Sequence, residues 1–207
     1  MFYKPETDQD HGLPHNPFNA IIAPRPIGWV STADAHGVPN LAPFSFFNGA
    51  AYSPPIIMLA FTGQKLGPQE GDRKDTLANI RETGEFAVNI VPTALMDQMN
   101  ITAGHYSRLG DEFEEAGLTA LPCNEIAVPR VGESPATLEC KLLQVVDLPN
   151  NAPGCNVTVF GQVVGVHIDD AILTDGLIDP SIYKPLARMG YLNYATIDSV
   201  FELKRPK

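Results

Sequence analysis

The sequence Ile27-Gly28-Trp29-Val30-Ser31-Thr32 is followed by Asp34-Ala35-His36-Gly37 and then by the apolar stretch Leu41–Phe47. The first stretch is apolar and ends in two hydroxyl residues, which predicts a strand. Gly37 can adopt a positive φ and the Asp34 side chain can hydrogen-bond within its own turn, so we expect a hairpin turn. Leu41–Phe47 is then the returning strand. Together these residues decide the fold class, because they predict antiparallel β-structure.

The rest of the chain predicts more short strands and few helices. Ile56–Phe61 is a continuous apolar run, which predicts a fully buried strand. Asp75 is expected to be the N-cap of a helix that stops at Gly84. The other expected elements are strands at Phe86–Ile90, Leu138–Leu142, Cys155–Ile168 and Tyr194–Leu203, a short helix at Thr93–Asn100, and an insertion of loops over residues 101–135 with one short helix around Asp111–Ala116. Gly161 and Gly165 predict bends that help to close a barrel. The fold class is therefore mainly β, a β-barrel with peripheral helices.

Length and charge limit the classes of function. The 207 residues fit one domain, which we place at residues 18–207, after a polar arm with several prolines at residues 1–17. The formal net charge of −10 argues against nucleic acid and against an anionic membrane as partners, since both need a basic surface. An anionic ligand would therefore need a local basic pocket.

The cysteines and the N-terminus favour a cytoplasmic protein. Cys123, Cys140 and Cys155 form no C-x-x-C pair, and the N-terminus lacks the apolar segment of a secretory leader. No apolar run approaches the ~20 residues of a membrane-spanning helix. We therefore expect the reducing environment of the cytoplasm.

Motifs of the common phosphate, metal and hydrolase sites are absent from the sequence: G-x-G-x-x-G, G-x-x-x-x-G-K-[ST], H-E-x-x-H and G-x-S-x-G. The five histidines do not cluster. His167 and Asp169 could share one face of a strand and hold a metal, but a strand that runs into a polar turn explains them equally well. The sequence therefore predicts neither a metal site nor a catalytic side chain.

Three segments carry groups that suit a phosphorylated aromatic ligand. Val30-Ser31-Thr32 places two hydroxyls at a strand end, and Ala42–Asn48 gathers polar and aromatic residues before a turn. Arg73–Thr76 places two cations and a hydroxyl at a helix N-terminus, where a phosphate is favoured. Each segment also has an ordinary interpretation: a plain strand end, aromatic core packing, and an N-cap beside solvated cations. Spacing alone leaves a β-barrel that could bind a nucleotide.

A longer series of motifs runs through the chain. They are Pro24-Arg25-Pro26-Ile27-Gly28-Trp29-Val30-Ser31-Thr32, Asn40-Leu41-Ala42-Pro43-Phe44-Ser45-Phe46-Phe47-Asn48, Ser53-Pro54-Pro55, Lys74-Asp75-Thr76, Glu85-Phe86-Ala87-Val88-Asn89-Ile90, Asp111-Glu112-Phe113, Phe160-Gly161 and Pro185-Leu186-Ala187-Arg188. In this order, over about residues 18–203, the series resembles the flavin reductase-like, FMN-binding split-barrel family, and most closely its longer, flavoredoxin-type members. The resemblance implies a split barrel, bound FMN and a homodimer whose interface borders the flavin site. Two positions depart from the family pattern: Asn156 replaces a His that many shorter members carry, and one glycine, not two, follows in the Arg188 motif.

The resemblance also implies which residues bind FMN. By position they are Ser31, Thr32, Ser45, Phe46, Phe47, Asn48, Lys74, Asp75, Thr76 and Arg188. The two hydroxyl residues of the first strand would contact the phosphate or the ribityl chain. Ser45–Asn48 would lie along the ribityl chain and the isoalloxazine, Lys74–Thr76 would hold the phosphate, and Arg188 would contribute near the dimer interface.

The activity implied by the resemblance is NAD(P)H-dependent reduction of flavin, in which the nicotinamide gives a hydride to FMN. A partner monooxygenase or redox protein would then receive the electrons. Three alternatives stay open: a non-enzymatic FMN electron carrier, an oxidoreductase that acts on a small organic substrate with residues 101–135 as a lid, and a flavin-free barrel used for interaction.

Overall fold

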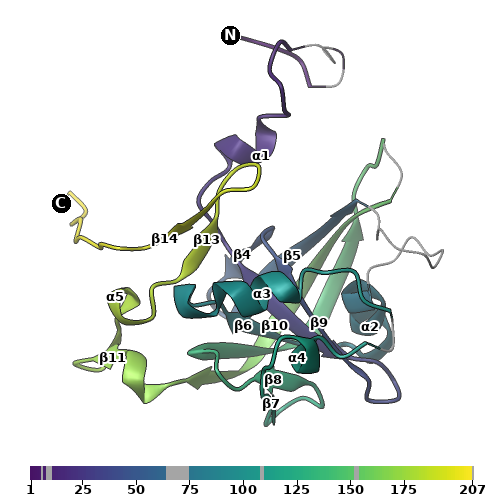
Figure 1. The fold of residues 1–207 in the computed structure, drawn as a ribbon, viewed down its shortest axis with the longest axis vertical. Helices are drawn as coiled ribbons and strands as arrows, with labels where there is room; N and C mark the ends of the chain where they lie inside the picture. The colour runs from purple at the N-terminus through teal and green to yellow at the C-terminus, as the bar shows by residue number, and fades with distance from the viewer. Residues whose placement is uncertain (6, 8–10, 64–74, 108–109, 152–153, 207) are drawn as a thin grey trace.

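The structure is a computed structural model that describes the chain except residues 6, 8–10, 64–74, 108–109, 152–153 and 207. Its main feature is a curled sheet of seven strands, each antiparallel to its neighbours (Figure 1). In spatial order the strands are β3 (Pro39–Phe44), β2 (Gly28–Ala33), β6 (Glu85–Ile90), β9 (Ala136–Asp147), β10 (Cys155–Ile168), β5 (Ile56–Gly63) and β4 (Phe47–Ala51). The predicted mainly β fold class is confirmed.

Shorter elements surround this sheet. A three-stranded sheet joins β1 (Arg25–Pro26), β13 (Leu186–Arg188) and β14 (Tyr194–Thr196). The two remaining hairpins are β7 (Ala120–Pro122) with β8 (Pro129–Val131), and β11 (Leu173–Thr174) with β12 (Leu177–Ile178). The helices are α1 (Phe18–Ile21), α2 (Asp75–Thr83), α3 (Met96–Ile101), α4 (Glu112–Glu115) and α5 (Pro180–Tyr183), with 3₁₀ turns η1 (Thr93–Leu95) and η2 (Asp170–Ile172). In Figure 1, α1 lies beside the β13–β14 hairpin, at one end of the barrel.

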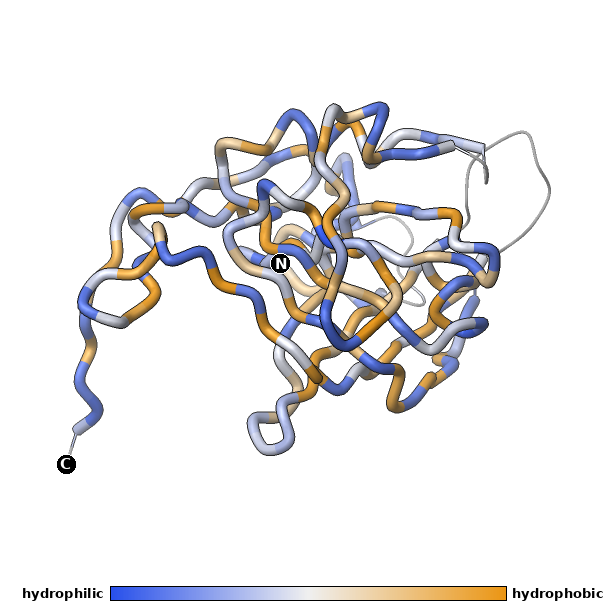
Figure 2. Tube along the Cα trace, turned by 90° about the horizontal axis from the view of Figure 1, so that it is seen from below, coloured by the Kyte–Doolittle hydropathy of each residue, from blue (hydrophilic) through white to orange (hydrophobic). Residues whose placement is uncertain are grey.

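Two clusters of apolar side chains form the core, and Figure 2 shows hydrophobic segments running through the centre of the body. Val30 belongs to the cluster inside the curled sheet, around the fully buried Phe61 and Phe86. Its neighbour Trp29 belongs to the second cluster, and its Nε1–H donates to the Thr102 hydroxyl at 2.8 Å. Because successive side chains of a strand point to opposite faces, β2 contributes to both clusters and is buried along its whole length.

The predicted hairpin and the predicted helix are both present. Asp34 Oδ1 accepts hydrogen bonds from the backbone N–H groups of His36 and Val38, each at 2.9 Å, and Gly37 has φ +83°. The α2 helix spans Asp75–Thr83, and Gly84 follows with φ +73°. A side chain is strained at such φ values, so glycine is the residue that fits both positions.

Three strand predictions were wrong in part. Leu41–Phe47 is not one strand, because β3 ends at Phe44 and β4 begins at Phe47. The chain changes its pairing partner there: β3 pairs with β2, whereas β4 pairs with β5 at the other edge of the sheet. The strand expected over Tyr194–Leu203 stops at Thr196, which lies opposite Leu186, the first residue of its short partner β13. Ile56–Phe61 was expected to be fully buried, but buried and half-buried residues alternate, since one face alone points into the barrel.

The longest strand, β10, is irregular near Gly161 and Gly165, where the sequence predicts bends. Its pairing with β9 shifts register between Phe160 and Gly161 and again between Val163 and Gly165. A Cβ at Gly161 would overlap the Phe86 ring, so the barrel closes tightly at this point. In the expected insertion, the helix around Asp111–Ala116 is present as α4, whereas the β7–β8 hairpin was not predicted. Among the described residues, no helix combines the length and the apolar character needed to cross a bilayer.

Candidate functional site

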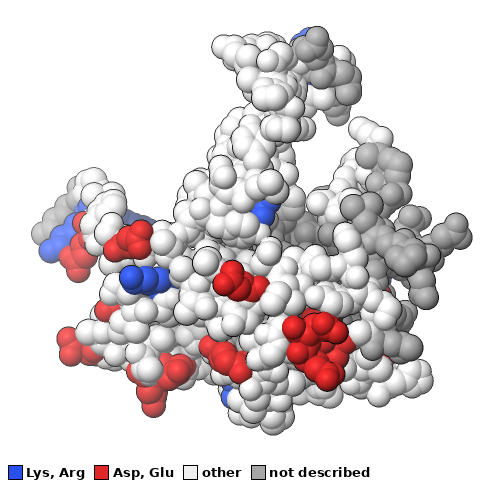
Figure 3. Space-filling model, in the orientation of Figure 1, with Lys and Arg blue, Asp and Glu red and all other residues white. Residues whose placement is uncertain are grey.

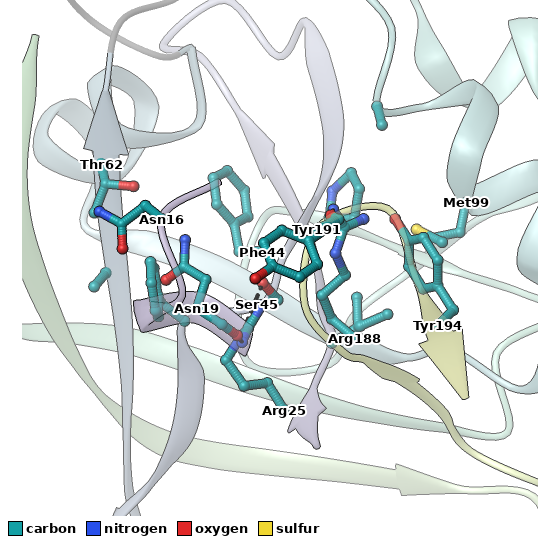
Figure 4. Close-up of a pocket in the computed structure, with 15 residues that line it drawn as sticks. Asn16, Asn19, Arg25, Phe44, Ser45, Thr62, Met99, Arg188, Tyr191 and Tyr194 are labelled. Atoms are coloured by element: carbon teal, nitrogen blue, oxygen red, sulfur yellow. Dashed lines mark hydrogen bonds between the residues drawn. The ribbon is translucent and has the colours of Figure 1, made fainter. Parts of the chain in front are cut away.

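A cleft of about 430 Å³ lies beside the break between β3 and β4 (Figure 4). Its walls come from the segment before β2, from that break, from β5 and α3, and from the β13–β14 hairpin. Four aromatic side chains contribute to the lining: Phe44, Phe46, Tyr191 and Tyr194. The volume lies within the roughly 300–1,000 Å³ that is typical of ligand pockets.

Arg25 is fixed in the floor of this cleft by four acceptors. Its Nη2 donates to the Met189 carbonyl at 3.0 Å, and its Nε donates to the Ser45 hydroxyl at 3.4 Å. Its Nη1 donates to the backbone carbonyls of Asn19 and Ile22. The guanidinium also lies 5.5 Å from the centre of a neighbouring aromatic ring, that of Phe46. These contacts join α1, β1 and the turn before β14, so Arg25 organises one wall of the cleft.

Arg188 brings a second positive charge to the cleft. Its guanidinium lies 4.5 Å from the centre of the Tyr194 ring and donates through Nη2 to the Tyr191 carbonyl. Burial lowers the pKa of Arg25, and the nearby charge of Arg188 lowers it further. Two cations held this close repel each other, and an anion between or beside them would offset that repulsion.

The cleft is a basic region of an acidic protein. Among the described residues that line it there are two arginines and no carboxylate, although the chain has a formal net charge of −10. Acidic side chains gather elsewhere, as over α4 in Figure 3, where the helix and its N-cap contribute Asp111, Glu114 and Glu115. The cleft therefore provides the local positive field that an anionic ligand needs on this protein.

Tyr191 lies at the exposed rim of the cleft, in the turn between β13 and β14. It has φ +56°, which is strained for an aromatic residue. Its ring lies 5.5 Å from the ring of His15, which comes from the N-terminal segment. A Cβ at the preceding residue, Gly190, would overlap Ala20 of α1, so the turn and the N-terminal segment are packed closely together.

Three of the residues predicted to bind FMN meet in the cleft: Ser45, Phe46 and Arg188 (Figure 4). Ser45 and Phe46 occupy the break between β3 and β4, where the Phe46 carbonyl still accepts from the Ala60 N–H of β5 at 2.8 Å. Phe47 packs in the barrel core and Asn48 is exposed on β4, where its side chain accepts from the Gly49 N–H at 2.8 Å.

Three of the four predicted hydroxyl residues, Ser31, Thr32 and Thr76, are buried and bonded within the protein. Ser31 Oγ donates to the Pro129 carbonyl at 2.6 Å. Thr32 Oγ1 accepts from Asn79 Nδ2 at 3.1 Å, and Thr76 Oγ1 accepts from Asn40 Nδ2 at 2.9 Å. Asp75 begins α2, while Lys74 lies outside the described residues. These hydroxyls tie β2, β3 and α2 together, and their roles toward FMN stay predictions.

Sequence reasoning missed Arg25 and Tyr194 as lining residues of the cleft. Arg25 stands between two prolines at the start of an apolar strand. A cation in that position needs a partner, so its position could have indicated a role in the site. The pairing of β1 with β13, which brings Arg25 next to the other arginine, has no signature in the local sequence.

Comparisons with known proteins agree with this architecture. A family model described as "Flavin reductase like domain" matches residues 22–187. Component B of nitrilotriacetate monooxygenase from Bacillus cereus is 31% identical, with a TM-score of 0.87 and 98% of each chain covered. The 2-nitrobenzoate 2-nitroreductase of Pseudomonas fluorescens is 27% identical, with a TM-score of 0.78 over 91% of this chain and 88% of that one. Flavoredoxin of Desulfovibrio vulgaris (Miyazaki F) is 26% identical, with a TM-score of 0.71 over 87% of this chain and 90% of its own. This chain therefore belongs to the flavin reductase-like family and has its split-barrel fold.

Proposed function

We propose that this chain is an FMN-binding oxidoreductase that takes a hydride from NAD(P)H. The observation that carries the proposal is the meeting of Arg25 and Arg188 in an aromatic cleft without carboxylates. FMN combines a flat ring system with a phosphate, so it needs apolar walls and a positive field in the same pocket. Membership in the flavin reductase-like family supports the same ligand.

The two arginines have different parts in this proposal. All three guanidinium nitrogens of Arg25 already donate to protein acceptors, so Arg25 chiefly positions the cleft walls. Of the Arg188 guanidinium, Nη2 bonds to a protein acceptor among the described residues, so its other N–H groups can serve a ligand. We therefore assign the direct contact with the anionic ligand to the Arg188 guanidinium.

Other predicted residues fit the same cleft. Ser45 and Phe46 would lie along the ribityl chain and the ring system, as the sequence predicts. Lys74–Thr76 stays the predicted phosphate segment, of which Lys74 lies outside the described residues. The homodimer implied by the family would border this site.

Bound FMN would supply the hydride acceptor, and this chain supplies binding, orientation and electrostatics. The aromatic walls of the cleft would exclude water from a bound ring, which would strengthen charge interactions there. With FMN bound, the guanidinium groups of the cleft would stabilise negative charge on the ligand. A general acid or base is not needed for this step.

The proposal is tested by anaerobic stopped-flow mixing of the FMN-loaded protein with NADH or NADPH. Rapid loss of the yellow flavin absorbance with either donor is expected. Retention of FMN without reduction by either donor would instead support an electron carrier. A protein that is colourless once unbound FMN has been removed by gel filtration would refute the proposal.

A second candidate is direct reduction of a small anionic aromatic substrate. It is favoured by the exposed rim, where Tyr191 and Arg188 combine a ring surface with a cation. The 2-nitrobenzoate 2-nitroreductase in the same structural group is named for such a substrate. Substrate-dependent reoxidation of the reduced protein without oxygen would support this candidate.

A further inference from the structure

A second group of reactive side chains lies outside the cleft. Cys123 Sγ, a Glu139 carboxylate oxygen and a His167 ring nitrogen all lie within 4.8 Å of one another. They come from three different segments: the residue after β7, the strand β9 and the strand β10. None of the three lines the cleft described above, so the group has no part in the proposed flavin chemistry.

Glu139 is the buried centre of this group. Its side chain is 1% exposed, while that of His167 is 22% exposed. The carboxylate accepts from the backbone N–H groups of Asn124 at 2.8 Å and Glu125 at 2.7 Å, which fix its orientation. Its Oε1 also lies 2.5 Å from His167 Nε2. A carboxylate held by backbone donors beside an imidazole has the outer support that metal-binding carboxylates usually have.

The strands leave space for this carboxylate. Gly165 lies opposite Glu139 in the β9–β10 pairing, at a register shift. A Cβ at Gly165 would lie 3.1 Å from the Glu139 carboxyl carbon, so a larger residue would crowd the group. His167 lies two residues further along β10, on the same face of the strand.

We propose that Cys123, Glu139 and His167 form a binding site for a zinc ion. Thiolate, carboxylate and imidazole are the three ligand types that Zn²⁺ takes in proteins, and three protein ligands leave a fourth position for water. Tetrahedral zinc with ordinary bond lengths holds such ligand atoms about 3.4–3.6 Å apart. The bonded His167–Glu139 pair must therefore open by roughly 1 Å from its separation of 2.5 Å. On binding, the thiol proton of Cys123 leaves to solvent and a zinc–sulfur bond forms.

The ion would fasten a loop to the sheet. The segment after Cys123 carries Ile126 and Val128, which pack with Ala87 in a small separate core cluster. Without metal, the bonds from the loop backbone to Glu139 hold this segment. A zinc ion would add bonds from both strands to the residue at the start of the loop, so the expected effect is stabilisation.

The sequence allows His167 and Asp169 to form a metal-binding pair, but in the structure Asp169 caps a 3₁₀ turn. Its carboxylate accepts from the Ala171 N–H at 2.9 Å and caps η2. The side-chain partner of His167 on the neighbouring strand is instead Glu139, which sequence spacing does not reveal.

The test uses the untagged full-length protein, stripped with a chelator and titrated with Zn²⁺ or Co²⁺. We expect one ion per chain, a rise in melting temperature, and with Co²⁺ the near-ultraviolet band of a thiolate bound to the metal. Cys123→Ser and His167→Gln should each weaken binding at least tenfold and remove the melting shift. Cys155→Ser is the matched control, because Cys155 is also half-buried but lies outside the group.

Three results would overturn the proposal: no bound zinc, unchanged affinity in Cys123→Ser, or a Co²⁺ complex without the thiolate band. Melting curves in chelator confirm that each variant folds, so a loss of metal cannot be mistaken for a loss of structure. FMN binding should be the same in both variants as in the wild type. This result separates failure of the zinc site from failure of the proposed flavin site.

Discussion

Arg25 of β1 and Arg188 of β13 are direct partners in an antiparallel strand pair, and both side chains line the same cleft. Like charges opposite each other in a sheet are destabilising. Burial and the nearby charge of Arg188 lower the pKa of Arg25, which means that the charged form of Arg25 is destabilised in this pair. Sites that break a local rule of stability are often functional, and an anion in the cleft would relieve the repulsion.

Replacement of Arg188 separates ligand binding from folding. Arg188→Gln should weaken FMN binding about tenfold, or 1–2 kcal/mol for a lost charged hydrogen bond, while stability stays equal or rises because the repulsion is gone. Quenching of FMN fluorescence and urea unfolding measure the two effects. Lys184→Gln is the control, since Lys184 is an exposed cation nearby that does not line the cleft. Equal FMN affinity in both variants would remove Arg188 from the site.

Replacement of Arg25 should act chiefly on structure. Arg25→Lys keeps the charge, but an ammonium cannot reach the acceptors Met189, Ser45, Asn19 and Ile22 together. We expect a loss of about 1–3 kcal/mol in the free energy of unfolding. Urea denaturation checks this value. A variant as stable as the wild type would show that the guanidinium does not hold the cleft walls.

Glu112 should make stability depend on pH. Burial raises the pKa of Glu112, against the hydrogen bond that it accepts from the Leu41 N–H, and the carboxylates of Asp75 and Asp111 raise it further. A raised pKa means that the folded state prefers the protonated acid. The stabilisation is therefore complete below the unfolded-state pKa and is lost as pH rises through the folded-state value.

Glu112→Gln removes this dependence and keeps an acceptor for the Leu41 N–H. The variant should be more stable than the wild type at neutral pH, and the difference should disappear in mild acid. Urea unfolding at a series of pH values gives the comparison. A variant that is less stable at neutral pH would show that the ionised carboxylate is favourable in this position.

Gly161 tests how tightly the barrel closes. Gly161→Ala places a methyl group against the Phe86 ring and should cost about 1–3 kcal/mol. Gly49→Ala is the matched control, because an added Cβ there meets no atom within 4 Å. Thermal unfolding of the two variants should differ clearly. Equal melting temperatures would mean that the ring moves aside without cost.

Local chemistry explains which parts of the fold could be predicted. The hairpin at Asp34–Gly37 and the end of α2 at Gly84 follow from turn and capping preferences of single residues. The break at Ser45 and Phe46 could not be found this way, because the apolar pattern runs on without a turn signal. The chain changes strand partner there, from β2 to β5, and that choice depends on the whole sheet.

The same limit applies to the site. Ser45, Phe46 and Arg188 were found because they stand in motifs of the family. The burial of the Ser31 and Thr32 hydroxyls could not be predicted from sequence, since their position at a strand end suggests exposure. In the structure both faces of β2 are covered, and buried asparagines bond to these hydroxyls.

A crystal structure of the protein grown with excess FMN tests the central claim most directly. We predict electron density for the isoalloxazine along Ser45 and Phe46, with an Arg188 guanidinium N–H within hydrogen-bond distance of an FMN oxygen. Density for FMN at another surface, or a cleft without flavin at saturating concentration, would contradict the account.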